Sequence, residues 1–110
     1  VAMGITTSTD KAIADEILVR LGIRDYFTFI MTCEEAGGDK ESPKVFLDAH
    51  KKLGTPKDET IVVEDGLLAI RGAKEADFYV IAVADKNEEQ NKAEIQELSD
   101  RYIESFEELL

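Results

Sequence analysis

The sequence has a single cysteine, a single histidine and no tryptophan, and these shortages exclude several kinds of chemistry. With Cys33 alone, the chain cannot form an internal disulfide, and this cysteine usage is typical of a reducing compartment, so we expect a cytoplasmic location. The one histidine, His50, lies in a separate charged segment. We therefore expect no cysteine–histidine nucleophile.

Positive charge is also scarce, with 13 basic residues against 24 acidic ones and a formal net charge of −11. Such a chain repels phosphate backbones and anionic membrane surfaces at long range, so nucleic acid and membrane are not expected partners. Much of the acidic charge lies in the helix-like stretch 86–100, where a solvated helix face that favours solubility is the simplest interpretation.

Long hydrophobic runs are absent as well. The longest clear one, FYVIAVA (78–84), is far shorter than the about 20 apolar residues of a membrane-spanning helix. The N-terminal stretch lacks the basic region and long apolar segment of a secretory signal. It begins at Val1 rather than at a methionine and already resembles the inside of a strand, so we expect the chain to start within a domain.

Short apolar runs alternate with segments of helical periodicity along the chain. The 110 residues, 44% of them hydrophobic, fit one domain, 1–110. We expect strands at 1–6, 27–32, 60–65 and 78–83, helices at 8–22, 42–54, 67–76 and 87–99, and a short segment 101–105 before a last turn. The helix at 42–54 is the best delimited, because Ser42 can cap its start, Pro43 suits its first position and Gly54 follows its end.

The expected strands are continuously apolar rather than alternating, which indicates burial on both faces. A parallel sheet covered by helices meets this requirement, so we predict an α/β fold with a doubly wound, three-layer, Rossmann-like sheet. In such sheets ligands bind beyond the carboxyl ends of the strands.

Polar residues follow each predicted strand, at 6–9, 33–43, 64–65 and 84–89. Hydroxyls and free backbone N–H groups can hold phosphate oxygens, a lysine can neutralise charge, and paired acids can bind a hard cation such as Mg²⁺. Together these groups favour phosphoryl chemistry. Each alone has a simpler interpretation: the hydroxyls cap a helix, the lysine is solvated, and the acid pair caps the next helix.

Four segments carry a resemblance: MGITTST (3–9), GGDKESPKVFLDAHKKLG (37–54), TIVVEDGLLAIRGAKEADFYVIAV (60–83) and DRYIESFEELL (100–110). In this order and spacing they resemble the haloacid dehalogenase superfamily, particularly its phosphatase and β-phosphoglucomutase-like branch. The resemblance covers nearly the whole chain.

The resemblance implies a role for five residues. Thr7 would be the hydroxyl that binds the transferring phosphoryl group, with the Ser8 backbone beside it. Lys40 would be the catalytic lysine that steadies the nucleophile and the phosphoryl charge. Asp65 would be a direct ligand of the Mg²⁺ cofactor, and Glu64 a second ligand or a group just behind it.

The sequence departs from the family pattern in two places near these residues. Gly66 and Ala69 stand where the family usually has a small hydroxyl residue and then a glycine, and Asp77 stands where an Ala-Gly pair usually ends the helix. The substrate contacts are therefore less secure than the metal ligands.

The resemblance also implies an Asp-x-Asp motif whose first aspartate attacks phosphate, and the 110 residues contain no such motif. Asp10, Asp25 and Asp39 do not form one. We therefore expect the C-terminal part of a hydrolase core, without the first strand and the cap, and inactive alone.

The function implied for the complete protein is Mg²⁺-dependent hydrolysis, or mutase chemistry, on a small phosphorylated metabolite through an aspartyl-phosphate. Two alternatives remain, a non-catalytic binding or assembly module and a receiver-like signalling domain. In receivers the acids come first and the lysine last, whereas the order here is Thr7, Lys40, Glu64, Asp65.

In the family the nucleophile strand lies between the strand ending at Thr7 and the strand ending at Asp65. We expect its place to be taken by the missing N-terminal segment, by a strand of a second chain, or by residues 1–7 shifting to pair with residues 60–65.

Overall fold

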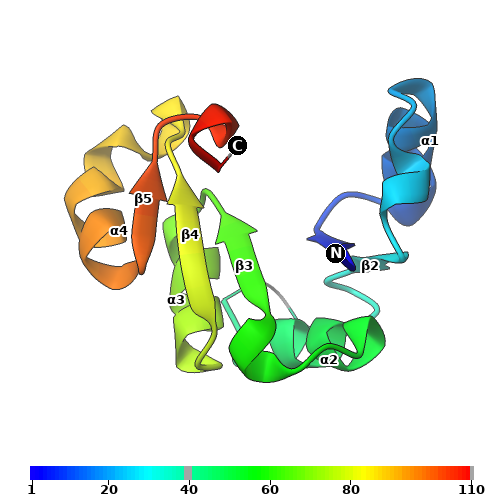
Figure 1. Cartoon of the computed structure of the whole chain (residues 1–110), viewed down its shortest axis with the longest axis horizontal. Coiled ribbons are helices and arrows are strands. Elements are labelled where there is room, and N and C mark those ends of the chain that lie inside the picture. The colour runs from blue at the N-terminus through cyan, green and yellow to red at the C-terminus, as the bar shows by residue number, and fades with distance from the viewer. Residues whose placement is uncertain (39–40, 110) are drawn as a thin grey trace.

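The computed structural model of the chain describes residues 1–38 and 41–109, and it shows short parallel strands flanked by helices (Figure 1). The strands are β1 (Gly4–Thr7), β2 (Phe29–Thr32), β3 (Ile61–Glu64), β4 (Tyr79–Val83) and β5 (Arg101–Ile103). The α-helices are α1 (Lys11–Arg20), α2 (Pro43–Leu53), α3 (Leu67–Glu75) and α4 (Lys92–Leu98). Short 3₁₀ turns are η1 (Arg24–Tyr26), η2 (Lys57–Glu59), η3 (Lys86–Asn91) and η4 (Phe106–Leu109).

The strands form two separate parallel parts, β1–β2 and β3–β4–β5. In Figure 1 the three-stranded part lies on the left and the β1–β2 part on the right. Parallel strands and intervening helices confirm the predicted α/β class. The expected shift of residues 1–7 onto 60–65 is wrong: β1 pairs with β2 from Gly4↔Phe29 to Thr7↔Thr32, while β3 pairs with β4. The other two expectations require a second polypeptide segment and stay predictions.

Helix α2 begins and ends as predicted. The Ser42 hydroxyl accepts a hydrogen bond from the Lys44 N–H at 3.3 Å, and Pro43 is the first helical residue. Gly54 has φ 73°, in the left-handed region where a residue without Cβ is favoured, and its N–H closes the helix on the His50 carbonyl.

Helix α2 joins the two parts of the sheet. It contacts β1 and β2 on one side and α3 on the other. Two consecutive residues divide between two cores: Val45 packs with Met31, Cys33 and Ala36, whereas Phe46 belongs to the larger core beneath β3–β4–β5.

The larger core is centred on β4, whose Val80 and Ala82 have no exposed surface. Phe78, Ile70 and Ile95 pack with them from the chain before β4 and from α3 and α4. The predicted burial on both faces is confirmed for β4, the middle strand of the three-stranded part. It is wrong for β3, whose Ile61 and Val63 are 53% and 43% exposed because β3 lies at the edge of that part.

The end of the chain differs from the sequence-based expectation. Segment 101–105 contains a strand, β5, and the single helix expected at 87–99 is divided into η3 and α4. Asp100 fixes the approach to β5, because its carboxylate accepts hydrogen bonds from the Val80 N–H at 2.8 Å and from Lys74 Nζ at 2.7 Å.

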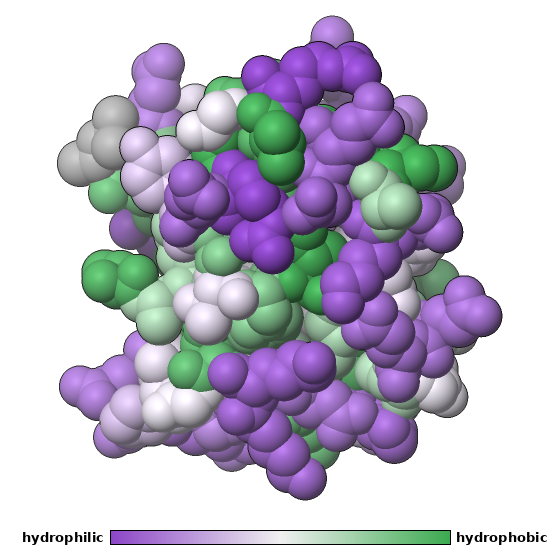
Figure 2. Space-filling model, turned by 90° about the vertical axis from the view of Figure 1, so that its right-hand side faces the viewer, coloured by the Kyte–Doolittle hydropathy of each residue, from purple (hydrophilic) through white to green (hydrophobic). Residues whose placement is uncertain are grey.

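Helix α1 is confirmed, with Asp10 as its cap. Its spaced residues Ile13, Ile17 and Leu21 remain 53%, 46% and 64% exposed, and α1 buries none of its residues fully. Figure 2 shows the side of the molecule that carries α1, where apolar surface lies among polar side chains. No helix in the described part of the chain is long and apolar enough to cross a membrane.

Candidate functional site

Three carboxylates gather where β3 and β4 end. Glu64 is the last residue of β3 and Asp65 follows it, and register places Glu64 beside Ala82 of β4. Asp85 follows β4 by two residues at the same edge of the sheet, and it lines the same surface hollow as Glu64 and Asp65. Parallel pairing thus brings residues from two distant segments to one edge of the sheet.

The carboxylates act strongly on one another. Partial burial, hydrogen bonds with Glu64 and Asp85, and the negative charges of both raise the pKa of Asp65 from 3.8 to about 6. The pKa of Asp85 is lowered, first because it accepts a hydrogen bond from the Asn87 N–H and then because it accepts one from Asp65. Asp65 is therefore the member of this pair that holds a proton most readily when no cation is bound.

The acid pair does not cap the next helix. Helix α3 begins after Gly66, which has no side chain with which to cap it. The first N–H of α3, on Leu67, donates instead to Glu88 Oε1 at 3.4 Å. The simpler interpretation of Glu64 and Asp65 as capping residues is therefore wrong.

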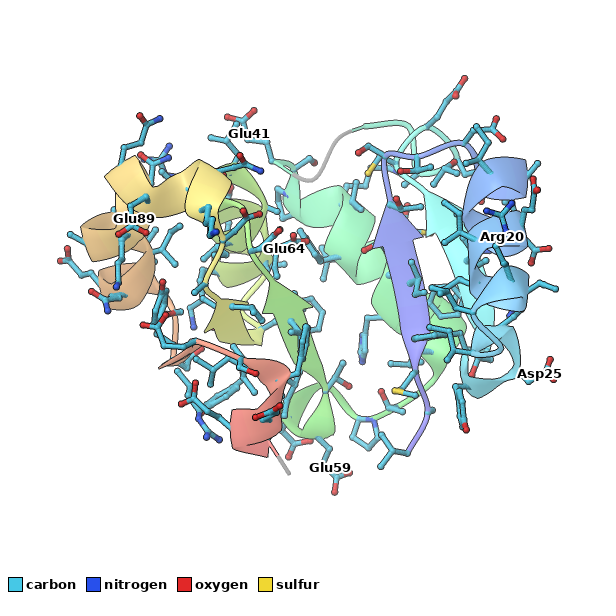
Figure 3. All side chains as sticks on the ribbon, turned by 90° about the horizontal axis from the view of Figure 1, so that it is seen from above. Arg20, Asp25, Glu41, Glu59, Glu64 and Glu89 are labelled. Atoms are coloured by element: carbon cyan, nitrogen blue, oxygen red, sulfur yellow. The ribbon has the colours of Figure 1, made fainter. Side chains whose placement is uncertain are left out.

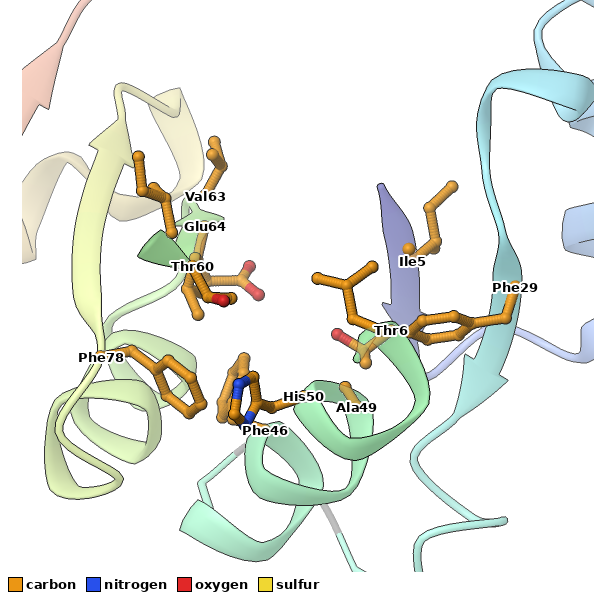
Figure 4. A pocket seen from close by; sticks show the side chains of 14 residues that line it. Ile5, Thr6, Phe29, Phe46, Ala49, His50, Thr60, Val63, Glu64 and Phe78 are labelled. Atoms are coloured by element: carbon orange, nitrogen blue, oxygen red, sulfur yellow. The ribbon is translucent and has the colours of Figure 1, made fainter. Parts of the chain in front are cut away.

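A cavity of about 250 Å³ separates the two parts of the sheet next to these acids. Ile5 and Thr6 of β1 line one wall, and residues 61–64 line the other (Figure 4). Phe46 and His50 of α2 close it from below. Figure 3 shows Glu64 on β3, across from β1. In Figure 4 its carboxylate points into the cavity.

Thr7 and Ser8 lie apart from the acids, at the end of β1. Thr7 ends β1 across the cavity, where its hydroxyl accepts the Thr9 N–H at 3.0 Å, and Ser8 is exposed. Neither caps α1, because Asp10 accepts the N–H groups of Ala12 and Ile13. Lys40 lies outside the described residues.

The two other polar candidates of the sequence have structural roles. Cys33 is buried in the smaller core. His50 Nε2 lies 2.7 Å from the Thr55 carbonyl oxygen, and its ring meets the Phe78 ring edge-on at 5.5 Å.

Asp85 is the site residue that sequence reasoning missed. It belongs to the polar stretch 84–89 after the fourth strand, so its position at the rim was visible in the sequence. Its proximity to Asp65 depends on the pairing of β3 with β4, which no local pattern specifies.

The donor chemistry at this edge fits Mg²⁺, which prefers carboxylate oxygens and keeps several water ligands. Glu64 and Asp65 supply such oxygens from adjacent positions. Within residues 1–38 and 41–109, no three acidic, histidine or cysteine side chains converge as a complete metal site. A cation here would therefore complete its shell with water and with donors from outside the described residues.

The departures from the family pattern have clear local consequences. Asp77 follows α3 with φ 68°, so a side chain stands in the left-handed region where glycine is usual. Ala69 is buried in the larger core.

Comparison with known proteins gives a consistent result. The family model for haloacid dehalogenase-like hydrolases matches residues 1–83. A glyceraldehyde 3-phosphate phosphatase of Methanopyrus kandleri is 35% identical over 82 residues, which are 74% of this chain and 35% of that protein. A fructose-1-phosphate phosphatase of Escherichia coli is 28% identical over 81 residues, 74% of this chain and 43% of that protein.

Solved structures agree over the whole fold. A phosphatase of the same family from Thermococcus onnurineus has a TM-score of 0.80 at 27% identity. The match covers 98% of this chain and 48% of that phosphatase. CbbY from Rhodobacter sphaeroides, solved with phosphate, has a TM-score of 0.81 at 24% identity, with 99% of this chain and 48% of that chain covered.

The chain thus spans between about a third and a half of the relatives it matches. Its parallel α/β architecture and the match over residues 1–83 lead to one conclusion: the chain belongs to the haloacid dehalogenase-like hydrolases.

Proposed function

We propose that this chain supplies the cation-binding and phosphate-binding part of a phosphomonoester hydrolase or phosphomutase. The substrate would be a small phosphorylated metabolite, as the names of the two phosphatase relatives indicate for those proteins. The observation that carries the proposal is the placement of Glu64 and Asp65 at the end of β3, with Glu64 pointing into the cavity opposite β1.

The described residues have distinct roles in this proposal. Asp65 and Glu64 would hold Mg²⁺, which when bound offsets negative charge on the phosphoryl group. The Thr7 hydroxyl and the N–H groups after β1 would hold phosphoryl oxygens from the opposite wall. Lys40, from the segment before α2, would add positive charge.

The covalent step requires an aspartate nucleophile that these 110 residues do not place in an Asp-x-Asp motif. In the complete protein a carboxylate oxygen of the first aspartate would bond to phosphorus while the ester oxygen leaves, taking a proton from the second aspartate of the motif. Water, or a hydroxyl of a second substrate, would then attack phosphorus and release the carboxylate. We propose that the segment carrying this aspartate occupies the cavity between β1 and β3 as a strand. We also propose that the protein acts in the cytoplasm.

The first test uses the isolated chain with p-nitrophenyl phosphate and Mg²⁺. We expect no turnover, because the chain supplies supporting groups without the nucleophile. Hydrolysis that survives purification to homogeneity and is lost in Asp65→Asn would contradict this and place a nucleophile within these residues.

The second test uses the complete protein. Asp65→Ala and Lys40→Ala should each lower kcat/KM by orders of magnitude. His50→Ala and Cys33→Ala are the controls, because Cys33 is buried in the smaller core and the His50 ring packs against Phe78 at the base of the cavity. A comparable loss of turnover in the His50 variant, with folding intact, would mean that the site is misplaced.

A further inference from the structure

Asp85 is held in a defined position beside Asp65. One of its carboxylate oxygens accepts the Asn87 N–H at 2.9 Å, which fixes the side chain at the start of η3. The same carboxylate lies within hydrogen-bonding reach of Asp65. Lys86, Asn87 and the exposed Phe106 line the hollow with the acids.

This position suits a hydrogen-bond acceptor better than a third metal ligand. Among the described residues Asp85 does not converge with Glu64 and Asp65 as a complete metal site. Mg²⁺ keeps several water molecules, and their hydrogens need acceptors around the first shell of ligands. A carboxylate next to the liganding carboxylate meets that need.

We propose that Asp85 is a positioning residue for the cation, accepting a hydrogen bond from a cation-bound water while its bond to Asn87 holds it beside Asp65. The proposal rests on the proposed function, because it assumes a cation on Asp65. It adds a contribution from the β4 end of the sheet, outside the acid pair that follows β3.

The test measures Mn²⁺ binding to the 110-residue chain by isothermal titration calorimetry, with the number of Mn²⁺-bound waters from water-proton relaxation. Asp85→Asn is the informative variant, since asparagine also caps helices well and keeps the bond to the Asn87 N–H. Glu89→Gln is the matched control, because Glu89 is an exposed residue of the same turn and lies away from Glu64 (Figure 3).

We expect Asp85→Asn to weaken Mn²⁺ binding about 10-fold or more, the usual effect of losing such an outer partner. Glu89→Gln should change it less than about twofold, because an exposed charge is screened by solvent. The number of bound waters should be the same in Asp85→Asn and in the unaltered chain. A merely structural role for Asp85 would move the unfolding temperature in EDTA and leave the affinity of the folded chain unchanged.

Two outcomes would overturn the inference: equal affinity in Asp85→Asn and the unaltered chain, or one additional bound water in Asp85→Asn, which would make Asp85 a direct ligand. Asp65→Asn separates this failure from that of the proposed function. If Asp65→Asn also binds Mn²⁺ normally, the cation site itself is misplaced, and both proposals fail.

Discussion

The crowding of carboxylates predicts that Asp65 lowers the stability of the cation-free chain at neutral pH. Its pKa rises from 3.8 to about 6 on folding, so the folded state binds this proton more tightly than the unfolded state. The stability that the proton confers is complete below pH 3.8 and is lost as pH rises through about 6. A shift of this size corresponds to about 3 kcal/mol at full effect, and to about 1 kcal/mol at Asp65, whose partly buried carboxylate is still screened by solvent.

Asp65→Asn should therefore raise the free energy of unfolding by about 1 kcal/mol at pH 7.5 in EDTA. Urea denaturation followed by circular dichroism measures the difference, and the same titration at pH 3.5 should show almost none. Added Mg²⁺ should stabilise the unaltered chain and leave Asp65→Asn unchanged. An Asp65→Asn chain that is less stable at pH 7.5, or equally shifted at both pH values, would refute the reasoning.

Two further predictions concern stability. Asp100→Asn removes the ion pair with Lys74 and weakens the bond to the Val80 N–H, so unfolding should become easier by about 1 kcal/mol at pH 7. Because the pKa of Asp100 is lowered on folding, its contribution to the free energy of unfolding is present above pH 3.8 and is lost as pH falls further. Thermal melts of Asp100→Asn and the unaltered chain should therefore converge in acid. A difference that stays constant with pH would argue against this role. Gly4→Ala places a Cβ against the end of the Phe29 ring, which can swing toward the neighbouring cavity. We therefore expect a cost of about 1 kcal/mol in denaturant titrations and a smaller one in a Phe29→Leu background. Equal costs in both backgrounds would exclude the clash.

The parts of the fold that the sequence predicted are those with local causes. Ser42, Pro43 and Gly54 delimit α2 through their own hydrogen bonds and backbone preferences, and the apolar run of β4 indicates burial wherever the strand pairs. β5 was missed because three residues, one of them fully buried, carry too little pattern, and its place is set by β4.

The candidate site divides in the same way. Glu64 and Asp65 are adjacent in sequence and stand out after an apolar strand, so a local reading finds them. Asp85 becomes their neighbour only through the register of β3 with β4, and that register results from packing of the whole larger core. The separation of the sheet between β1 and β3 follows from the family resemblance, which places a further strand there, and not from any local pattern.

The attachment of both sheet parts to α2 has a consequence for how the chain opens. The neighbouring residues Val45 and Phe46 of α2 pack in the smaller and the larger core respectively. Separation of the β1–β2 part from α2 would therefore expose the smaller core and leave Phe46 packed in the larger one. The chain then behaves as two cooperative units of unequal strength sharing one helix. Backbone amides of β1 and β2 should exchange with solvent deuterium through this partial opening, whereas those of β4 should exchange only on global unfolding.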